Sequence, residues 1–234
     1  MGDVLRIRDF NQEEFNNFVL KNKVIGFVDK PVTLKSGRSS NWYVNWRTVT
    51  EDVFATDQLS DYLLSFTKSL GLNPDCFYGV PEGASKLGVI TQYKWAKQKD
   101  NYDSGSHVLA MGRGKAKEHG AEKDRFFLGT PKGKTIVIED VTTTGSSLLD
   151  TLNYLNESCV EVIAAYGLTN RMELTNDGQS VEEAIKKKGV NYYSLSKSTD
   201  LFPRAYQLLK PSDDVADAVE REFEKYGIQK IKLR

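Results

Sequence analysis

The sequence predicts an α/β fold built on a mostly parallel, doubly wound sheet flanked by helices. Short apolar runs of strand length alternate along the chain with segments whose apolar residues recur at helical spacing. No internal repeat or low-complexity tract divides the 234 residues, and a hydrophobic content of 39% is that of an ordinary globular protein. In such a sheet ligands bind beyond the carboxyl ends of the strands, so we expect the site in the turns that follow strands.

The expected elements follow one another in the order typical of this fold. Periodicity predicts helices at residues 10–22, 59–70, 85–98, 147–157, 181–188 and 213–225, and strands at 76–80, 107–111, 134–138, 160–168 and 191–195. Residues 31–47 alternate around a Lys-Ser-Gly-Arg turn and predict a hairpin-like hood, whereas the charged, glycine-containing residues 112–125 predict a surface loop. We expect one domain over residues 1–234, with hood elements at about 1–50, a core at about 51–210 and a C-terminal helix at about 211–234.

Composition narrows the functional classes. The 32 basic and 32 acidic side chains cancel, so neither nucleic acid nor an anionic membrane is an expected partner. The sequence shows no apolar run of signal-peptide or membrane-span character. Cys76 and Cys159 have no metal-ligand spacing, which favours reduced thiols and a cytoplasmic protein.

Residues 138–147, IEDVTTTGSS, place two neighbouring acids and a hydroxyl-rich turn directly before a predicted helix. A helix N-terminus presents unpaired N–H groups and the positive end of the helix dipole, which attract phosphate. Glu139 and Asp140 offer oxygens that bind sugar hydroxyls or a divalent cation. An ordinary helix cap needs only one hydroxyl, so the stretch predicts a site for a phosphorylated ribose that carries Mg²⁺. The candidate phosphate ligands are Thr142, Thr143, Thr144, Gly145, Ser146 and Ser147.

Residues 137–147 resemble the phosphoribosyl-pyrophosphate (PRPP) motif of type I phosphoribosyltransferases, which implies that fold and a PRPP site. A second segment narrows the family. Residues 33–38, TLKSGR, followed by Trp42-Tyr43-Val44-Asn45, resemble the N-terminal segment of orotate phosphoribosyltransferases. The resemblance implies that Lys35, Tyr43 and Val44 contact orotate. A cation beside flat apolar surfaces suits a planar anion.

Residues 113–120, RGKAKEHG, resemble the mobile catalytic loop of the same family. Arg113, Lys117 and His119 match its pattern, and the resemblance implies that they act in catalysis together with Asp140. It also implies a homodimer in which the 112–125 loop covers the pyrophosphate of the neighbouring subunit. Gly114 stands where the family has a lysine, and Lys115 is an alternative PRPP contact.

Two further segments complete the resemblance. Residues 169–173, TNRME, place Arg171 where the family has an arginine that pairs with the orotate carboxylate. Residues 79–86, GVPEGASK, stand where the family binds pyrophosphate. Gly83 replaces a lysine found in many relatives, so either Lys86 substitutes for it or backbone N–H groups bind the pyrophosphate.

The resemblance implies an enzyme that joins orotate to PRPP, with Mg²⁺, to give orotidine 5′-monophosphate and pyrophosphate in pyrimidine (UMP) biosynthesis. Mg²⁺ would be bound mainly through PRPP and water, with Glu139 and Asp140 as further ligands. Lys117 and His119 are alternative general acids. Two other functions remain open at this point: a phosphoribosyltransferase for a purine or another pyrimidine, and a PRPP-binding regulator without catalysis.

Overall fold

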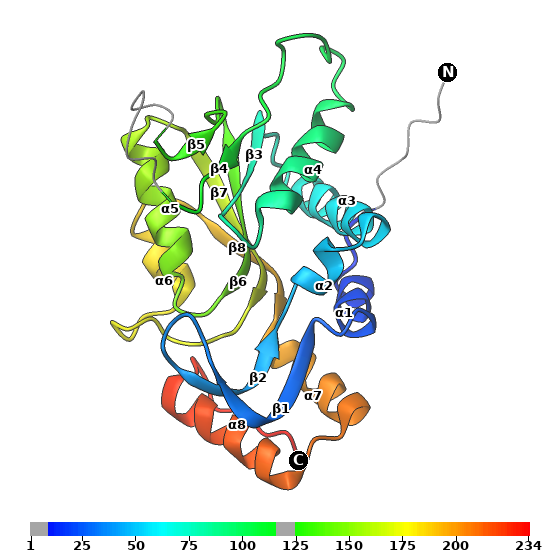
Figure 1. Ribbon diagram of the computed structural model, residues 1–234, viewed down its shortest axis with the longest axis vertical. Helices are drawn as coiled ribbons and strands as arrows, with labels where there is room; N and C mark the ends of the chain where they lie inside the picture. The colour runs from blue at the N-terminus through cyan, green and yellow to red at the C-terminus, as the bar shows by residue number, and fades with distance from the viewer. Residues whose placement is uncertain (1–8, 116–124) are drawn as a thin grey trace.

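The computed structural model describes residues 9–115 and 125–234. Its centre is a four-stranded sheet with the strand order β3-β6-β7-β8 (Figure 1). The strands are β3 (Cys76–Gly79), β6 (Thr135–Thr142), β7 (Val162–Asn170) and β8 (Tyr192–Lys197). Every neighbouring pair is parallel, which confirms the predicted fold class.

Helices cover both faces of this sheet because its strands are apolar on both sides. Ile136 and Ile138 of β6 enter one apolar cluster, and Val137 between them enters the other. The first cluster includes side chains of α1 (Gln12–Lys21), α3 (Val53–Ser69), α4 (Ser85–Ala96) and α7 (Ser198–Leu209). The second includes side chains of α5 (Ser146–Glu157) and α6 (Val181–Lys186). Among the described residues, no helix combines the length and the apolar character that a membrane span requires.

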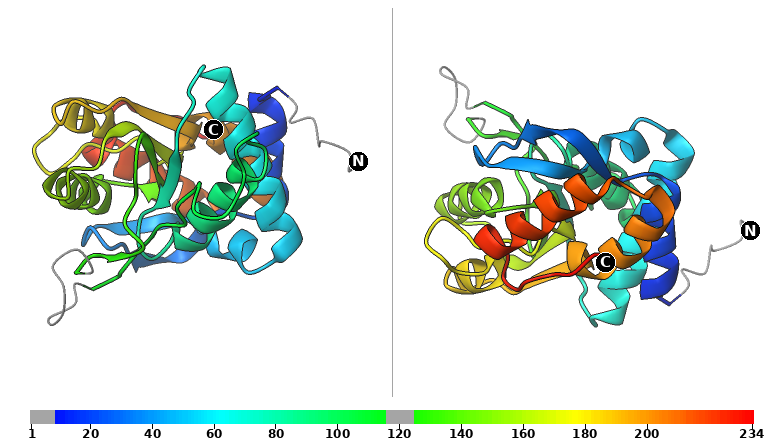
Figure 2. Two further views of the ribbon diagram at one scale, coloured as in Figure 1. Left: turned by 90° about the horizontal axis from the view of Figure 1, so that it is seen from above. Right: turned by 90° about the horizontal axis from the view of Figure 1, so that it is seen from below.

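The predicted hairpin is present and lies at one end of the molecule. Its strands β1 (Ile25–Thr33) and β2 (Ser39–Val44) are antiparallel, and the short helix α2 (Arg47–Thr50) follows them. The C-terminal helix α8 (Asp213–Tyr226) lies beneath the hairpin (Figures 1 and 2). The Trp42 ring contacts Phe202 of α7 and Phe223 of α8. The hood is therefore built from both ends of the described chain.

The predicted strand at 107–111 is wrong. Of these residues only Met111 lies in a strand, β4 (Met111–Gly112), which pairs with β5 (Phe127–Leu128) outside the main sheet. The Gln92 side chain explains this, since it accepts from the Phe77 N–H at the sheet edge and donates to the Val108 carbonyl. A side-chain amide thus occupies the place of ladder hydrogen bonds.

Two other elements differ from the prediction. No helix was predicted over the residues of α7, which contains Pro203 although a proline usually ends a helix. Strand β6 runs four residues further than expected, because Glu139, Val141 and Thr142 continue to pair with β7. The two acids consequently belong to the strand itself rather than to the turn after it.

Helix α4 packs backbone to backbone against β3 through two glycines. A Cβ atom on Gly88 would overlap the Gly79 nitrogen, and one on Gly79 would overlap the Ala84 carbonyl oxygen. This close approach fixes the segment between β3 and α4, residues 80–84, at the carboxyl edge of the sheet.

We predict that Gly88→Ala destabilises the protein by about 1–3 kcal/mol, the usual cost of overpacking. Helix propensity alone predicts the opposite sign, since alanine is favoured over glycine inside helices by about 1 kcal/mol. Urea unfolding of the two proteins measures the difference. A midpoint equal to or above that of the unsubstituted protein would show that the contact is not tight.

Candidate active site

The turn between β6 and α5 has an unusual helix start. Gly145 occupies the N-cap position with φ of 73°, and no side chain caps the helix there. The first N–H groups of α5 therefore lack the side-chain acceptor that Ser or Thr normally supplies. Thr143 and Ser147 are half-buried and Ser146 is exposed, while the Thr144 hydroxyl points toward the Ser146 hydroxyl at 3.5 Å. Uncapped N–H groups beside several hydroxyls are suited to an anion.

Thr142 does not belong to this set. Its side chain is 1% exposed, and its hydroxyl lies 2.6 Å from the Tyr192 hydroxyl of β8. The Thr142 carbonyl accepts from the Arg171 N–H, which closes the pairing of β6 with β7. Thr142 therefore holds the two strand ends together inside the protein.

The two acids differ in environment. Glu139 is 5% exposed, and burial, followed by the neighbouring charge of Asp140, raises the pKa of its carboxyl well above the ordinary range. Asp140 is half-buried, and one of its oxygens accepts from the Val141 N–H at 2.8 Å. The other oxygen lies against Gly83, where any Cβ atom would overlap it. Gly83 thus leaves room for the Asp140 carboxylate at the mouth of the site.

Lys35 reaches this turn from the hairpin. Its Nζ donates to the Ser147 hydroxyl over 2.8 Å, although 112 residues separate the two in the chain. Its charge also opposes the rise in the pKa of Glu139. The lysine expected beside orotate therefore lies, in this structure, between the buried acid and the start of α5.

Arg171 is buried at the end of β7, with 1% of its surface exposed. Its Nε donates to Glu173 at 2.7 Å, and its Nη2 donates to Glu222 at 3.0 Å and to the Ser40 hydroxyl at 2.9 Å. The guanidinium lies 3.5 Å from the centre of the Trp42 ring. Nη1 donates to none of the residues that the structure describes. Two acids thus hold the guanidinium by two of its nitrogens.

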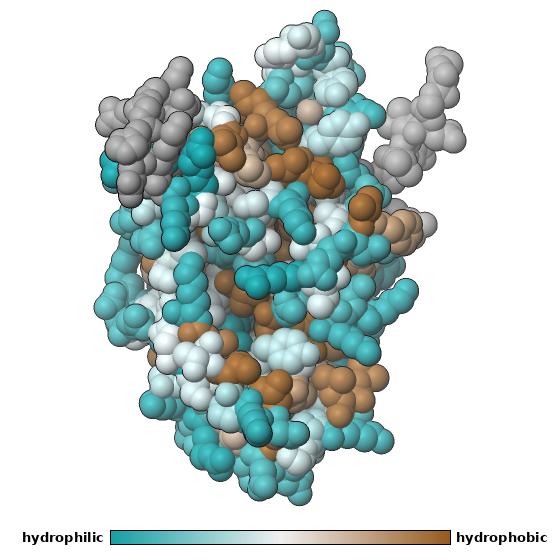
Figure 3. All heavy atoms as spheres, in the orientation of Figure 1, coloured by the Kyte–Doolittle hydropathy of each residue, from teal (hydrophilic) through white to brown (hydrophobic). Residues whose placement is uncertain are grey.

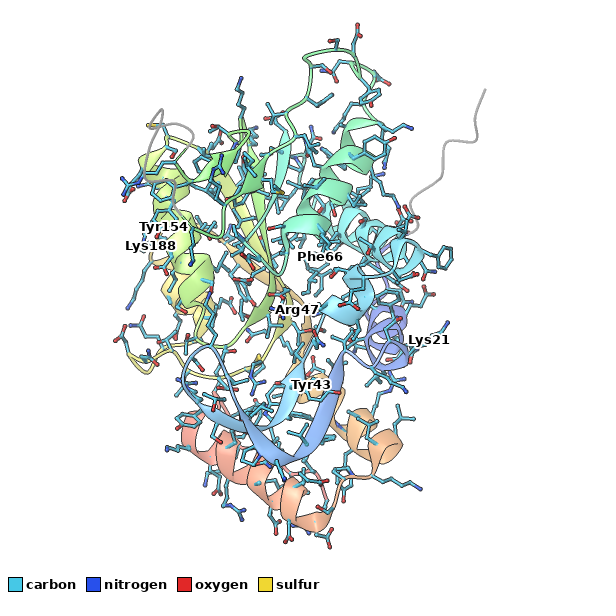
Figure 4. All side chains as sticks on the ribbon, viewed as in Figure 1. Lys21, Tyr43, Arg47, Phe66, Tyr154 and Lys188 are labelled. Carbon is cyan, nitrogen blue, oxygen red and sulfur yellow. The ribbon has the colours of Figure 1, made fainter. Side chains whose placement is uncertain are left out.

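The remaining orotate candidates lie on the hairpin. Tyr43 is half-buried with its ring over Gly26, where an added Cβ atom would overlap it. Val44 is also half-buried and packs on the main apolar cluster. Figure 4 shows Tyr43 on the hairpin and Arg47 at the start of α2, both near the middle of the face on which β6 ends.

Arg47 is a functional candidate that the sequence did not indicate. It is exposed and forms no ion pair with any residue in the described ranges. Its only sequence signal is a basic residue after the aromatic segment that ends at Trp46. That signal is too common to single out a site.

The pyrophosphate segment and the charged loop are placed in part. Lys86 is exposed, and its Nζ lies 3.3 Å from the Thr50 carbonyl of α2. Gly114 lies against Glu82, whose carboxylate an added Cβ atom would overlap. Arg113 and Lys115 are described, with the Arg113 N–H bonded to the Phe126 carbonyl. The expected catalytic residues Lys117 and His119 lie outside the described residues.

Known proteins with similar sequences point to one family of enzymes. No family model matches the sequence. The orotate phosphoribosyltransferase of Bradyrhizobium diazoefficiens is 32% identical over 178 residues, which covers 72% of this chain and 86% of the relative. The orotate phosphoribosyltransferase of Aquifex aeolicus is 28% identical over 184 residues, which covers 78% of this chain and 93% of the relative.

Solved structures share the fold. The orotate phosphoribosyltransferase of Francisella tularensis matches with a TM-score of 0.65 at 21% identity, over 92% of this chain and 99% of that one. The Leishmania donovani UMP synthase matches with a TM-score of 0.67 at 16% identity, over 91% of this chain and 42% of that one. The Mycobacterium tuberculosis orotate phosphoribosyltransferase solved in complex with PRPP matches with a TM-score of 0.56 at 20% identity, over 81% and 98%.

The parallel sheet and the acidic strand end before a hydroxyl-rich turn define a type I phosphoribosyltransferase. Identity of 32% over most of both chains is more specific than the fold. The chain belongs to the orotate phosphoribosyltransferase family, and it is a transferase.

We predict that Glu139→Gln changes thermal stability in a pH-dependent way. A carboxyl whose pKa is raised by folding stabilises the protein below its unfolded pKa, and this stability is lost as the pH rises toward the folded pKa. Glutamine does not ionise, so the variant should melt about 2–4 °C above the unsubstituted protein near about pH 8, a shift typical of about 1 kcal/mol. The advantage should vanish near about pH 4.

Calorimetry at several pH values measures this difference. Glu224→Gln, which makes the same substitution at an exposed carboxylate on α8, is the matched control. A melting difference for Glu139→Gln that stays constant with pH would contradict the assigned cause.

Proposed function

We propose that the enzyme transfers the phosphoribosyl group of PRPP to orotate at the carboxyl end of β6, giving orotidine 5′-monophosphate and pyrophosphate in the pyrimidine (UMP) pathway. The contact between Lys35 and Ser147 is the observation that carries this proposal. It brings the hairpin segment and the strand-to-helix turn, the two parts of the chain that bear the family motifs, to a single place.

The 5′-phosphate binds at the start of α5. Backbone N–H groups there and the hydroxyls of Thr143, Thr144, Ser146 and Ser147 donate to its oxygens, and Gly145 supplies the positive φ with which the chain turns into the helix. Lys35 already donates to Ser147, so its ammonium is placed to neutralise phosphate charge. We leave Thr142 out of this cradle because its hydroxyl is engaged with Tyr192.

The acids serve the ribose and the metal ion. The Asp140 carboxylate lies beside Gly83, whereas the Glu139 side chain is buried. Mg²⁺ commonly takes one or two carboxylates and completes its shell with substrate oxygens and water. No cluster of three or more His, Cys, Asp or Glu side chains suited to a metal occurs among the described residues. The donors present therefore fit an ion that arrives with PRPP and is bound by Asp140, with Glu139 as a further ligand.

Charge stabilisation is the main catalytic task. The bond between the ribose C1 and the pyrophosphate breaks while negative charge grows on the leaving group. Fixed cations placed there stabilise this charge without reorganisation, and Mg²⁺ when bound adds to the effect. We assign this role to Arg113, Lys115, Lys117 and His119, and we place Lys86 and the backbone of residues 80–84 on the pyrophosphate.

The base binds on the hairpin side of the site. We assign the orotate ring to Tyr43 and Val44 and its carboxylate to Arg171. Nη1 supports this role, because it donates to no residue in the described ranges while Nε and Nη2 are bound by Glu173 and Glu222. Arg47, exposed near the middle of the same face, is a second cation available to the carboxylate.

We propose a homodimer in which residues 112–125 reach the neighbouring site. Exposed apolar side chains support an interface on the face that carries α3, α4 and the β4–β5 pair. They are Val53, Phe54, Ile90, Tyr93, Leu109 and Leu128. Figure 3 shows apolar surface in the upper part of this face. A second copy of the chain would remove these side chains from water.

The activity is tested by the loss of orotate absorbance with PRPP and Mg²⁺, with uracil and hypoxanthine in parallel. We expect turnover of orotate alone, because uracil and hypoxanthine lack the carboxylate that Arg171 would bind. Turnover of hypoxanthine or uracil instead would indicate another type I phosphoribosyltransferase. PRPP binding without turnover of any base would indicate a regulator.

The dimer is tested by mixing two inactive variants, Lys117→Ala and Asp140→Asn. If the loop acts across the interface, a mixed dimer contains one intact site and one doubly substituted site, so activity should return. We choose Asp140 rather than Arg171 for the second variant, because removal of Arg171 would leave two buried acids unpaired. Mixed dimers verified by mass that stay inactive would place the loop in its own subunit.

A further inference from the structure

Two arginines and two glutamates form a buried, charge-balanced network beneath the hairpin. Arg171 bonds Glu173 and Glu222, and Arg38 bonds the second Glu173 oxygen at 2.9 Å. The second terminal nitrogen of Arg38 donates to the Leu174 carbonyl at 2.8 Å. Arg38 directly follows the Lys35 turn, and Arg171 and Glu173 follow β7. The network therefore joins the hairpin turn to the carboxyl edge of the sheet.

Glu222 is the one member of this network that comes from the C-terminal helix. A single oxygen, Oε1, accepts from Arg171 Nη2 at 3.0 Å, from Trp42 Nε1 at 3.1 Å and from the Ser40 hydroxyl at 2.8 Å. Three donors on one oxygen fix both the Arg171 fork and the inner face of β2. No motif of the chain pointed to this residue, since its partners lie 51, 180 and 182 residues away.

We propose that Glu222 is a positioning residue for the substrate base: it orients Arg171 so that Nη1 faces the orotate carboxylate. Glu173 accepts from Nε and Glu222 accepts from Nη2. Because the guanidinium is rigid and planar, these two hydrogen bonds also fix the direction in which Nη1 points. Trp42 packs on the flat face of the guanidinium and prevents tilting. Glu222 touches no substrate itself and acts only through Arg171. This inference rests on the orotate role proposed for Arg171.

If Glu222 only stabilised the fold, its removal would affect the KM values for orotate and PRPP alike. The phosphate cradle lies at the end of β6 and the start of α5, whereas the described side chains that hydrogen-bond to the Glu222 carboxylate are Ser40, Trp42 and Arg171, on the orotate side. Loss of Glu222 should therefore act on orotate and spare PRPP.

The test is steady-state kinetics of Glu222→Ala with each substrate varied in turn. We expect the KM for orotate to rise about tenfold, equivalent to about 1.4 kcal/mol, while the KM for PRPP stays within about twofold. Glu222→Gln retains an oxygen acceptor for the three donors but loses the charge, so its KM for orotate should be about threefold above that of the unsubstituted protein, between the unsubstituted protein and Glu222→Ala. Glu224→Ala, on the exposed side of the same helix, should leave both KM values unchanged.

Equal rises in both KM values, or an orotate KM that does not move, would overturn the proposal. If Glu222→Ala does not fold, Glu222→Gln is the deciding variant. An orotate KM raised about threefold with the PRPP KM unchanged supports the proposal, and no selective rise in the orotate KM overturns it.

Arg171→Lys distinguishes a failure of the role of Arg171 from a failure of the role of Glu222. An unchanged orotate KM in Arg171→Lys removes the role of Arg171 and with it that of Glu222. A raised one, with Glu222→Ala at the value of the unsubstituted protein, removes the role of Glu222 alone.

Discussion

The pairing of β6 with β7 beyond the apolar core is the constraint on which the site depends. The ladder continues through Glu139, Val141 and Thr142, and the Arg171 N–H closes it on the Thr142 carbonyl. Side chains alternate along a strand, so this extension buries Glu139 and turns Asp140 toward the site. The same ladder fixes where β7 ends and hence where Arg171 leaves the sheet. Both halves of the site thus follow from one run of backbone hydrogen bonds.

The charged groups of the site fall into two sets, one on the phosphate side and one on the base side. On the phosphate side, Lys35 and the uncapped start of α5 face two acids, one of which is buried with a raised pKa. On the base side, two arginines and two glutamates cancel one another inside the protein. Buried charges are expensive unless they are paired, so the balanced network places an arginine there without an uncompensated charge.

Much of this could be predicted from the sequence because it rests on local patterns. The alternation of apolar runs and helical segments predicts the parallel sheet, and the acids and hydroxyls of residues 139–147 predict the phosphate turn. No helix was predicted at α7, whose Pro203 is unfavourable inside a helix, and the mostly apolar residues 107–111 suggested a strand whose place the Gln92 side chain takes. The contact of Lys35 with Ser147 and the role of Glu222 could not be predicted, because both depend on partners more than 50 residues away.

The position of α8 beneath the hairpin has a consequence for how the protein is made. The inner face of β2 carries Ser40 and Trp42, and it is covered by a helix about 180 residues later in the chain. The chain is synthesised from its N-terminus, so the hairpin emerges before α8. Until α8 has been synthesised, the side of Trp42 that α8 covers stays exposed. Contacts so distant in sequence slow folding, because a long loop closes before any contact forms. The hood therefore cannot reach its final packing until the C-terminal helix has been synthesised.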